Sequence, residues 1–228
     1  MKKNIIHLCL AAVVLSLFLV VFERIDTTKS HNTGGKEKIT QIAKNTTKKK
    51  DNEHSENVLL LKVGQRKNNS ARGKITLERI TTPMSAIKDG PLEIAINTIS
   101  IYKIQPQNNN QKQRENDTYQ TSKATNFYYT IHIDYNVKNT SNSSMQLKGL
   151  KSISTNTGQH IDVNSGLLYG GSALKVDPNS TRGSSAEGLI KKGDEKKINK
   201  VTLKFGEVID SDSSTTLGGA EPMDFELK

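Results

Sequence analysis

The clearest hydrophobic pattern in the chain lies between residues 126 and 142, where apolar and polar side chains alternate. One face of an extended segment would carry Phe127, Tyr129, Ile131, Ile133, Tyr135 and Val137, and the other Tyr128, Thr130, His132, Asp134, Asn136 and Lys138. Alternation of aromatic and β-branched residues is typical of a strand with one face in a core and the other in water. A helix would scatter the same residues around its circumference. The segment is therefore predicted to be the central strand of an all-β domain.

Shorter apolar runs on both sides of this strand predict further strands, separated by turn residues. They lie at residues 58–63, 74–80, 92–101, 145–154, 160–163, 184–190, 198–209 and 223–227. The phase of the apolar positions shifts between Ile96 and Ile99, which predicts a bulge near Asn97 and Thr98. A kink is expected at Gly149. Six to nine short strands without helical periodicity indicate a β-sandwich.

The same patterns predict the core and one long connection. The residues expected to be buried are Tyr129, Ile131, Ile133, Tyr135, Ile94, Ile96, Val201, Leu203 and Phe205. Residues 105–126 are polar, include three consecutive asparagines and offer no core residue. This stretch is expected to be a long loop that is either mobile or functional.

A separate pattern occupies residues 1–26. Lys2 and Lys3 precede an apolar run from Ile5 to Phe22, which indicates a membrane anchor or a secretion signal. The run is near the length that crosses about 30 Å of hydrocarbon, and no small-residue cleavage pattern follows it. An uncleaved anchor is therefore favoured over a cleaved signal. If the segment were cleaved, the protein would be secreted. The two early lysines favour a cytoplasmic N-terminus and an extracellular remainder.

The chain has one cysteine, Cys9, which excludes an intramolecular disulfide framework and a zinc site of several cysteines. Lipidation of Cys9 would need small residues before it, whereas His7 and Leu8 stand there. The simpler interpretation is that Cys9 is one more apolar residue of the span.

Composition changes the interpretation of the next segment. Apolar residues make up only 33% of the chain and the net charge is +10, so part of the chain contributes little to a core. Residues 27–57 are rich in Lys, Thr and Asn, and we expect a disordered tether there. Its lysines could alternatively contact anionic polymers or lipid head groups. No nucleic-acid partner is expected, because no aromatic residues are interleaved with the lysines.

The predicted domains are thus an anchor at residues 1–26, a tether at 27–57, preceding strands at 58–88 and the sandwich at 89–228. Within the last segment, several stretches carry a resemblance. They are GPLEIAIN at 90–97, the pattern Tyr-x-Ile-x-Ile-x-Tyr-x-Val-Lys-Asn-Thr at 129–140, Gly158-Gln159, and VTLKF at 201–205.

This order of segments resembles the telokin-like, immunoglobulin-like domains of unknown function on secreted proteins and lipoproteins of Gram-positive bacteria. Those domains are related in fold to an immunoprotective secreted antigen. The likeness spans about Asp89 to Leu227, and it implies an extracellular immunoglobulin-like fold without assigned catalytic residues. The chain departs from the family in lacking a lipidation signal, in the insert at residues 105–126 and in the strands before Asp89.

One candidate metal site lies on the polar face of the predicted central strand. His132, Asp134 and Asn136 share one strand face at a spacing that could place two or three ligands on a metal. The simpler interpretation is a largely exposed polar face, and no metal is expected because the row is flat and lacks an evident outer shell. Ser165 and Ser184 lack the context of a nucleophile. No cofactor is expected, and the catalytic, cofactor-binding and metal sites are all predicted to be absent.

Two loop motifs have simpler explanations. Gly170-Gly171 and Gly218-Gly219 could suggest phosphate cradles, but no Gly-Lys-Ser/Thr follows either pair. The stretch at 210–213, Asp-Ser-Asp-Ser, resembles the opening of a calcium loop without its later glycine and glutamate, and it is predicted to be a hairpin loop.

Three classes of function follow. The favoured one is a membrane-anchored extracellular immunoglobulin-like module that contacts an unknown protein or cell-wall partner. The alternative is a surface protein that binds a polyanion, either a cell-wall polymer or lipid head groups, through its lysines. An enzyme is the least supported, because no acid–base or nucleophile constellation is evident.

Overall fold

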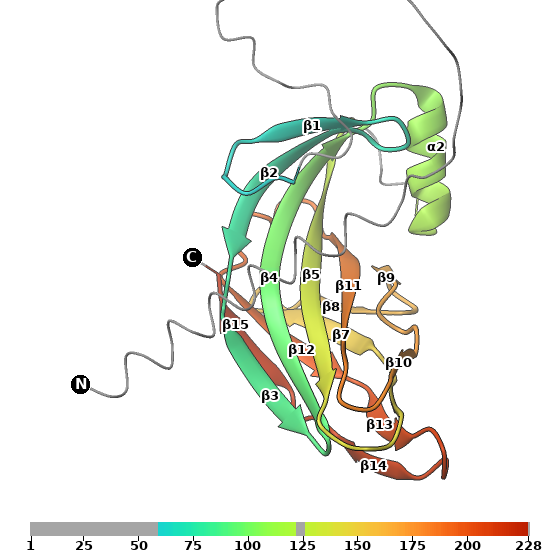
Figure 1. Cartoon of the computed structure of the whole chain (residues 1–228). Coiled ribbons are helices and arrows are strands. Elements are labelled where there is room, and N and C mark those ends of the chain that lie inside the picture. Colours follow the sequence, from blue (N-terminus) through green and yellow to red (C-terminus); the bar gives the residue numbers. More distant parts are fainter. Residues whose placement is uncertain (1–58, 122–125, 228) are drawn as a thin grey trace, which may run out of the picture. The chain divides into compact units, whose positions relative to one another are not determined.

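Residues 59–121 and 126–227 are described by the computed structural model shown in Figure 1. Over these ranges the chain is all-β, with fifteen strands and one helix. All strand pairs within them are antiparallel, and they form one seven-stranded and two four-stranded sheets. The predicted all-β class is confirmed. The expected number of six to nine strands was too low, because strands of two to four residues carry too little periodicity to be recognised.

The seven-stranded sheet has the order β1-β2-β4-β5-β11-β9, and β3 also pairs with β4. Its strands are β1 (Arg66–Asn69), β2 (Gly73–Thr81), β3 (Ser85–Asp89), β4 (Leu92–Gln105), β5 (Tyr128–Asn139), β9 (Leu167–Leu168) and β11 (Thr181–Ile190). β5 pairs with β4 on one side and with β11 on the other, so the segment with the clearest alternation is indeed a central strand (Figure 1). The strands before Asp89 belong to this same sheet.

The two smaller sheets have the orders β10-β6-β13-β14 and β15-β12-β7-β8. Their strands are β6 (Met145–Leu147), β7 (Leu150–Thr155), β8 (His160–Asp162), β10 (Leu174–Val176), β12 (Lys200–Phe205), β13 (Glu207–Asp210), β14 (Thr216–Gly219) and β15 (Met223–Glu226). β13 and β14 are joined by the loop that contains residues 211–213. The Asp210 carboxylate accepts hydrogen bonds from the backbone of Asp212 and Ser213, which confirms the predicted hairpin loop.

The chain passes between the two smaller sheets at glycines. Gly149, with φ of +55°, separates β6 from β7, and Gly206 separates β12 from β13. The Gly206 N–H donates to the Gly149 carbonyl at 2.8 Å. A Cβ on Gly149 would lie 1.9 Å from the Gly170 carbonyl oxygen, and one on Gly206 would lie 2.4 Å from the Lys148 carbonyl oxygen. Both crossings therefore need glycine, and the predicted kink at Gly149 is confirmed.

One hydrophobic core joins the seven-stranded sheet to both smaller sheets. It contains the nine residues that the sequence pattern predicted to be buried, each at most 9% exposed: Tyr129, Ile131, Ile133, Tyr135, Ile94, Ile96, Val201, Leu203 and Phe205. The bulge predicted near Asn97 and Thr98 is also present, since the register of β4 against β5 shifts between Ile96 and Thr98. The shift keeps Ile96 and Ile99 on the same buried face.

A second, smaller core covers the opposite face at one end of the seven-stranded sheet. Its buried members are Leu60, Ile75, Leu77, Ile104, Tyr119 and Tyr128. Tyr128 and Tyr129 are neighbours on β5 and enter different cores, as strand alternation requires. This end of the sheet is therefore apolar on both faces. Water reaches the face opposite the main core only further along β5.

The long polar loop expected at residues 105–126 is wrong in three respects. Gln105 ends β4, and Asn109–Thr118 forms a helix, α2, whose N-terminus is capped by the Asn108 side chain accepting from the Gln111 N–H at 2.9 Å. Tyr119, directly after the helix, is buried. The helix was missed because nearly all its residues are polar, so no apolar stripe marks it.

The strand expected at residues 58–63 is also wrong over its described part, residues 59–63. Leu60 enters the smaller core, but Leu59, Leu61 and Val63 are exposed. Gln65 explains the conformation, because its side-chain oxygen accepts from the backbone N–H groups of Leu61 and Lys62. These hydrogen bonds occupy groups that a strand ladder would need.

The predictions for the anchor at Ile5 to Phe22, for Cys9 and for the tether at 27–57 lie outside the described residues. Within the described ranges, no helix combines the length and hydropathy needed to cross a membrane.

Replacing Ile133 with alanine should lower the free energy of unfolding by about 2–5 kcal/mol, because the side chain is fully buried in the main core. Denaturant-induced unfolding measures this difference. Lys138→Ala, at an exposed position of the same strand, is the control and should change it by less than about 0.5 kcal/mol. An unchanged stability in Ile133→Ala would contradict the assigned face of β5.

Candidate functional site

Arg72, in the turn between β1 and β2, lies between two buried carboxylates. Its Nε is 3.2 Å from Oε1 of Glu115 on α2, and its Nη2 is 2.7 Å from Oε1 of Glu187 on β11. Nη1 also donates to Oε2 of Glu187 at 3.0 Å. One guanidinium thus connects a hairpin, the helix and a strand of the sheet through charge-assisted hydrogen bonds.

Two tyrosines complete these contacts. The Tyr119 hydroxyl donates to Glu187, and the Tyr128 hydroxyl donates to Glu115. The two rings meet edge to face with centroids 6.1 Å apart. Burial, reinforced by the nearby carboxylates, raises the pKa of both phenols far above the usual value, so both remain protonated donors.

His132 joins the cluster from β5. Its Nδ1 is 3.6 Å from Oε2 of Glu187, and its Nε2 is 3.1 Å from Oδ1 of Asp134. Burial lowers the pKa of His132, but the hydrogen bond with Asp134 and the charges of Asp134 and Glu187 outweigh burial and raise this pKa to about 9. His132 is therefore charged at neutral pH.

The buried charges of this group balance. Arg72 and protonated His132 face Glu115 and Glu187, and Asp134 is the more exposed partner of His132. Burial raises the pKa of Glu187, but the nearby His132, the charge of Arg72 and the hydrogen bonds from Arg72 and Tyr119 lower it to about 2. We refer to Arg72, Glu115, Tyr119, Tyr128, His132 and Glu187 as the ionic cluster.

The expected exposed row of His132, Asp134 and Asn136 needs correction. All three are half-buried, and the ring of Tyr102 lies 6.0 Å from that of His132. Asn136 donates to Asn97 and takes no part in the His132–Asp134 pair. Among the described residues, no group of three or more His, Cys, Asp or Glu side chains is placed to hold a metal.

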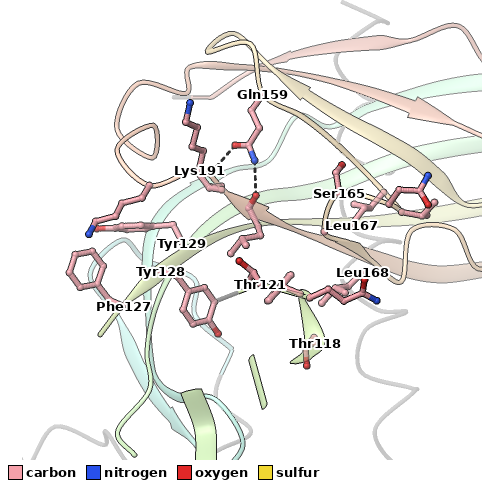
Figure 2. A pocket seen from close by; sticks show the side chains of 18 residues that line it. Thr118, Thr121, Phe127, Tyr128, Tyr129, Gln159, Ser165, Leu167, Leu168 and Lys191 are labelled. Atoms are coloured by element: carbon pink, nitrogen blue, oxygen red, sulfur yellow. Dashed lines mark hydrogen bonds between the residues drawn. The ribbon is translucent and has the colours of Figure 1, made fainter. Parts of the chain in front are cut away.

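A pocket of about 860 Å³ lies against the tyrosines of the ionic cluster (Figure 2). It is bordered by the end of α2 and residues 118–121, the start of β5, the β8–β9 connection and the end of β11. The rings of Tyr119 and Tyr128 line it, while their hydroxyls bond to the buried carboxylates. We call it the tyrosine pocket. The two tyrosines therefore stand between the pocket and the buried carboxylates of the ionic cluster.

The lining of the tyrosine pocket contains two lysines, Lys191 and Lys192, and no Asp or Glu among the described residues. The Lys192 Nζ lies 5.8 Å from the centroid of the Phe127 ring, and the Lys103 Nζ lies 4.6 Å from it. Leucines and hydroxyl groups make up much of the rest. The pocket therefore suits a ligand with an apolar part and a negative charge.

Gln159 fixes the end of β11 beside these lysines. Its Nε2 donates to the Leu189 carbonyl at 2.8 Å, and its Oε1 accepts from the Lys191 N–H at 2.9 Å (Figure 2). The backbone that carries the first lysine is thereby anchored to the turn between β7 and β8.

Ser165 lines the pocket, but its hydroxyl donates to the Asp162 carboxylate at 2.8 Å. A serine, a histidine and a carboxylate also lie in a row on the strand pair β7 and β8. There the Ser154 Oγ is 2.9 Å from the His160 Nδ1, but the His160 Nε2 is 3.9 Å from Asp162, beyond hydrogen-bond reach. Neither serine is activated as in a catalytic triad.

Sequence reasoning considered His132 only as a metal ligand, expected it to be exposed, and missed the rest of the ionic cluster. Glu115 and Glu187 lie 43 and 115 residues from Arg72, so no local motif links them. The available signal was Glu187 itself, a lone charge in the otherwise uncharged stretch from Ser184 to Ile190.

No protein-family model and no curated protein matches this sequence. Similar solved structures include a functionally unknown protein from Listeria monocytogenes, at 13% identity and a TM-score of 0.43 over 68% of this chain and 88% of that one. The yjhA protein from Bacillus subtilis matches at 12% identity and a TM-score of 0.33, over 53% and 78%. The putative ApaA protein from Bordetella pertussis matches at 12% identity and 0.30, over 62% and 93%. TM-scores this low carry no argument about this chain.

Replacing Arg72 with methionine should lower the free energy of unfolding by about 3–5 kcal/mol, because two buried carboxylates lose their shared cation. Chemical denaturation measures the loss. Arg66→Met, at an exposed position of the same hairpin, is the control and should cost less than about 0.5 kcal/mol. Adding Glu115→Gln and Glu187→Gln to Arg72→Met should recover part of the loss. If Arg72→Met were as stable as the wild type, the cluster would have no structural role.

Stability should also depend on pH through His132 and Glu187. Folding raises the pKa of His132 from 6.5 to about 9, so its contribution is complete below pH 6.5 and is lost as the pH rises through about 9. Folding lowers the pKa of Glu187 from 4.5 to about 2, so its contribution is complete above pH 4.5 and is lost as the pH falls through about 2. Melting temperatures measured across this range should be highest between pH 4.5 and 6.5.

His132→Gln should flatten the alkaline decline, whatever its effect on stability at a single pH. His160→Gln, at an exposed histidine, should leave the profile as in the wild type. An equally steep alkaline decline in His132→Gln would show that another group is responsible.

Proposed function

We propose that this chain is a non-catalytic binding module on a cell surface, with an immunoglobulin-like fold behind an N-terminal membrane anchor. The tyrosine pocket is its ligand site, and the ligand carries a negative charge. One observation supports this above the others: the described lining combines aromatic and aliphatic walls with Lys191 and Lys192, and includes no carboxylate.

A binding role agrees with the state of the ionisable groups behind the pocket. General acid–base catalysis favours a group whose pKa lies near the working pH. The phenols of Tyr119 and Tyr128 are shifted far upward, and the pKa of Glu187 is lowered to about 2. Both phenols are held as donors to the buried carboxylates, so neither is available for proton transfer. Their role in the proposal is to hold the pocket wall in place.

The location is inferred from the sequence. The apolar run from Ile5 to Phe22 and the preceding lysines support an uncleaved anchor with the folded part outside the cell. The immunoglobulin-like assignment is supported by the resemblance over Asp89 to Leu227 and by antiparallel sheets that share one core. The same resemblance supports our proposal that the protein comes from a Gram-positive bacterium.

The alternative function is binding of a polyanion, either a cell-wall polymer or lipid head groups. The observation in its favour is the excess of lysines, with a net charge of +10 for the whole chain. This alternative differs from the first in that the charge of the ligand matters more than its apolar part.

Phenyl phosphate is a suitable probe of the tyrosine pocket, because it combines an aromatic ring with an anion. In NMR titrations of the full chain, it should shift the backbone amides of Lys191 and Lys192, whereas benzylamine should not. Replacing both lysines with glutamine should weaken binding about tenfold or more, since hydrogen bonds to a charged group contribute about 1.5–3 kcal/mol.

Lys88→Gln with Lys175→Gln provides a control with the same loss of charge at exposed positions outside the pocket lining. Its affinity for phenyl phosphate should equal that of the wild type. Shifts confined to other surfaces, or an unchanged affinity after replacing Lys191 and Lys192, would contradict the proposal.

A further inference from the structure

A second, more open hollow of about 500 Å³ lies on the face of β7, β8 and β12. Its lining includes Lys148, Lys151, Lys204 and His160. The side chain of His160 is more than half exposed, and Lys151 and Lys204 are exposed as well. We call this hollow the lysine pocket. Its described lining contains no Phe, Tyr or Trp.

The two pockets adjoin. Val163, in the connection between β8 and β9, lines both of them and is 56% exposed. Gly171 lines the lysine pocket and packs against this valine, because a Cβ on Gly171 would come within 2.8 Å of Val163 Cγ1. We therefore call Val163, the apolar residue shared by the two pockets, the ridge between them.

The charges along this surface are mostly positive. Lys191 and Lys192 line one side of the ridge, and three lysines line the other, of which Lys148 pairs with Glu207 at 3.4 Å. Among the described residues that line the two pockets, Asp162 is the one carboxylate. It accepts hydrogen bonds from the Ser165 hydroxyl at 2.8 Å and the Asn164 N–H at 2.9 Å. Asp162 thus serves to shape the loop that carries Val163.

We infer that the ligand is an extended anionic polymer that lies in the tyrosine pocket, crosses Val163 and continues into the lysine pocket. This inference rests on the proposed function, and it specifies the class of ligand. Repeated phosphate groups along a flexible backbone would meet lysines on both sides of the ridge. Lysine suits such a ligand because it acts as a mobile point charge, whereas arginine favours fixed bidentate geometry.

The separation of the lysines into two groups favours a long chain over a small anion. A small anion gains from one group at a time, whereas a chain that reaches both gains the second contact at a high effective concentration. A nucleic acid would stack bases on aromatic side chains along its whole path. Aromatic side chains line the tyrosine pocket, but the described lining of the lysine pocket has no Phe, Tyr or Trp. A polymer of repeated phosphate groups without bases therefore suits the lysines of both pockets.

Long-chain polyphosphate tests this inference directly, with tripolyphosphate as the short probe. Isothermal titration of the full chain should give salt-dependent binding of the long chain and much weaker binding of tripolyphosphate. Lys191→Glu with Lys192→Glu, and separately Lys151→Glu with Lys204→Glu, should each weaken long-chain binding about tenfold or more, because each pair removes one end of a linked contact.

The exposed pair Lys88→Glu with Lys175→Glu changes the net charge equally and is the matched control. It should retain nearly the wild-type affinity. Val163→Asp places a carboxylate on the ridge, and it should weaken the binding of long-chain polyphosphate more than that of tripolyphosphate. Circular dichroism melting confirms that each variant is folded, and the corresponding glutamine variants should show the same order of effects at smaller size.

The outcomes separate this inference from the proposed function. Substitution of one lysine pair could abolish binding at its own pocket and leave the affinity of the other pocket for polyphosphate unchanged. That result would exclude a bridging chain, while the tyrosine pocket could still bind phenyl phosphate. Equal affinity for long-chain polyphosphate and tripolyphosphate would have the same consequence. Tighter binding to single-stranded DNA, or to vesicles of anionic lipid, would assign the surface to another class of ligand. If neither polyphosphate nor phenyl phosphate bound, the proposed function would fail as well.

Discussion

The shared contact of Arg72 with Glu115 and Glu187 is the interaction on which the candidate site depends. α2 has almost no apolar side chains with which to pack, and its buried residue is a glutamate. Its place against the sheet is therefore set by charge and by the tyrosine that follows it. Moving a charge from water into the protein interior costs free energy. Buried charges therefore persist only where each one is paired and hydrogen-bonded. Protonated His132 supplies the second cation that this pairing requires.

The tyrosines connect this buried network to the surface. Tyr119 and Tyr128 direct their hydroxyls to the carboxylates, and their rings form part of the pocket wall. A change in the ionic cluster would therefore alter the pocket without touching its lysines. The pocket lysines, Lys191 and Lys192, follow the end of β11. Lys192 lies near the Phe127 ring, and Gln159 accepts a hydrogen bond from the backbone of Lys191. Positioning and ligand contact are thus carried by different residues.

Much of the β structure could be predicted from local pattern. Alternation with a period of two identified β5 and its buried face from Tyr129 to Val137, and the change of phase between Ile96 and Ile99 located a bulge in β4. The same reasoning failed at residues 59–63, where hydrogen bonds to Gln65 replace a strand ladder. It also failed for α2, because a helix held through ion-pair and hydrogen-bond contacts of Glu115 shows no apolar stripe in the sequence.

The sequence by itself determined the all-β class, the central strand, the main core and the glycine kink at Gly149, because each follows from the order of neighbouring residues. Only the tertiary structure decided that His132 is half-buried and charged, and that Arg72 meets glutamates 43 and 115 residues away. It also decided that Lys191 and Lys151 lie on either side of one ridge. Side-chain charges interact through space, and the chain order does not record which distant residues the folded sheets bring together.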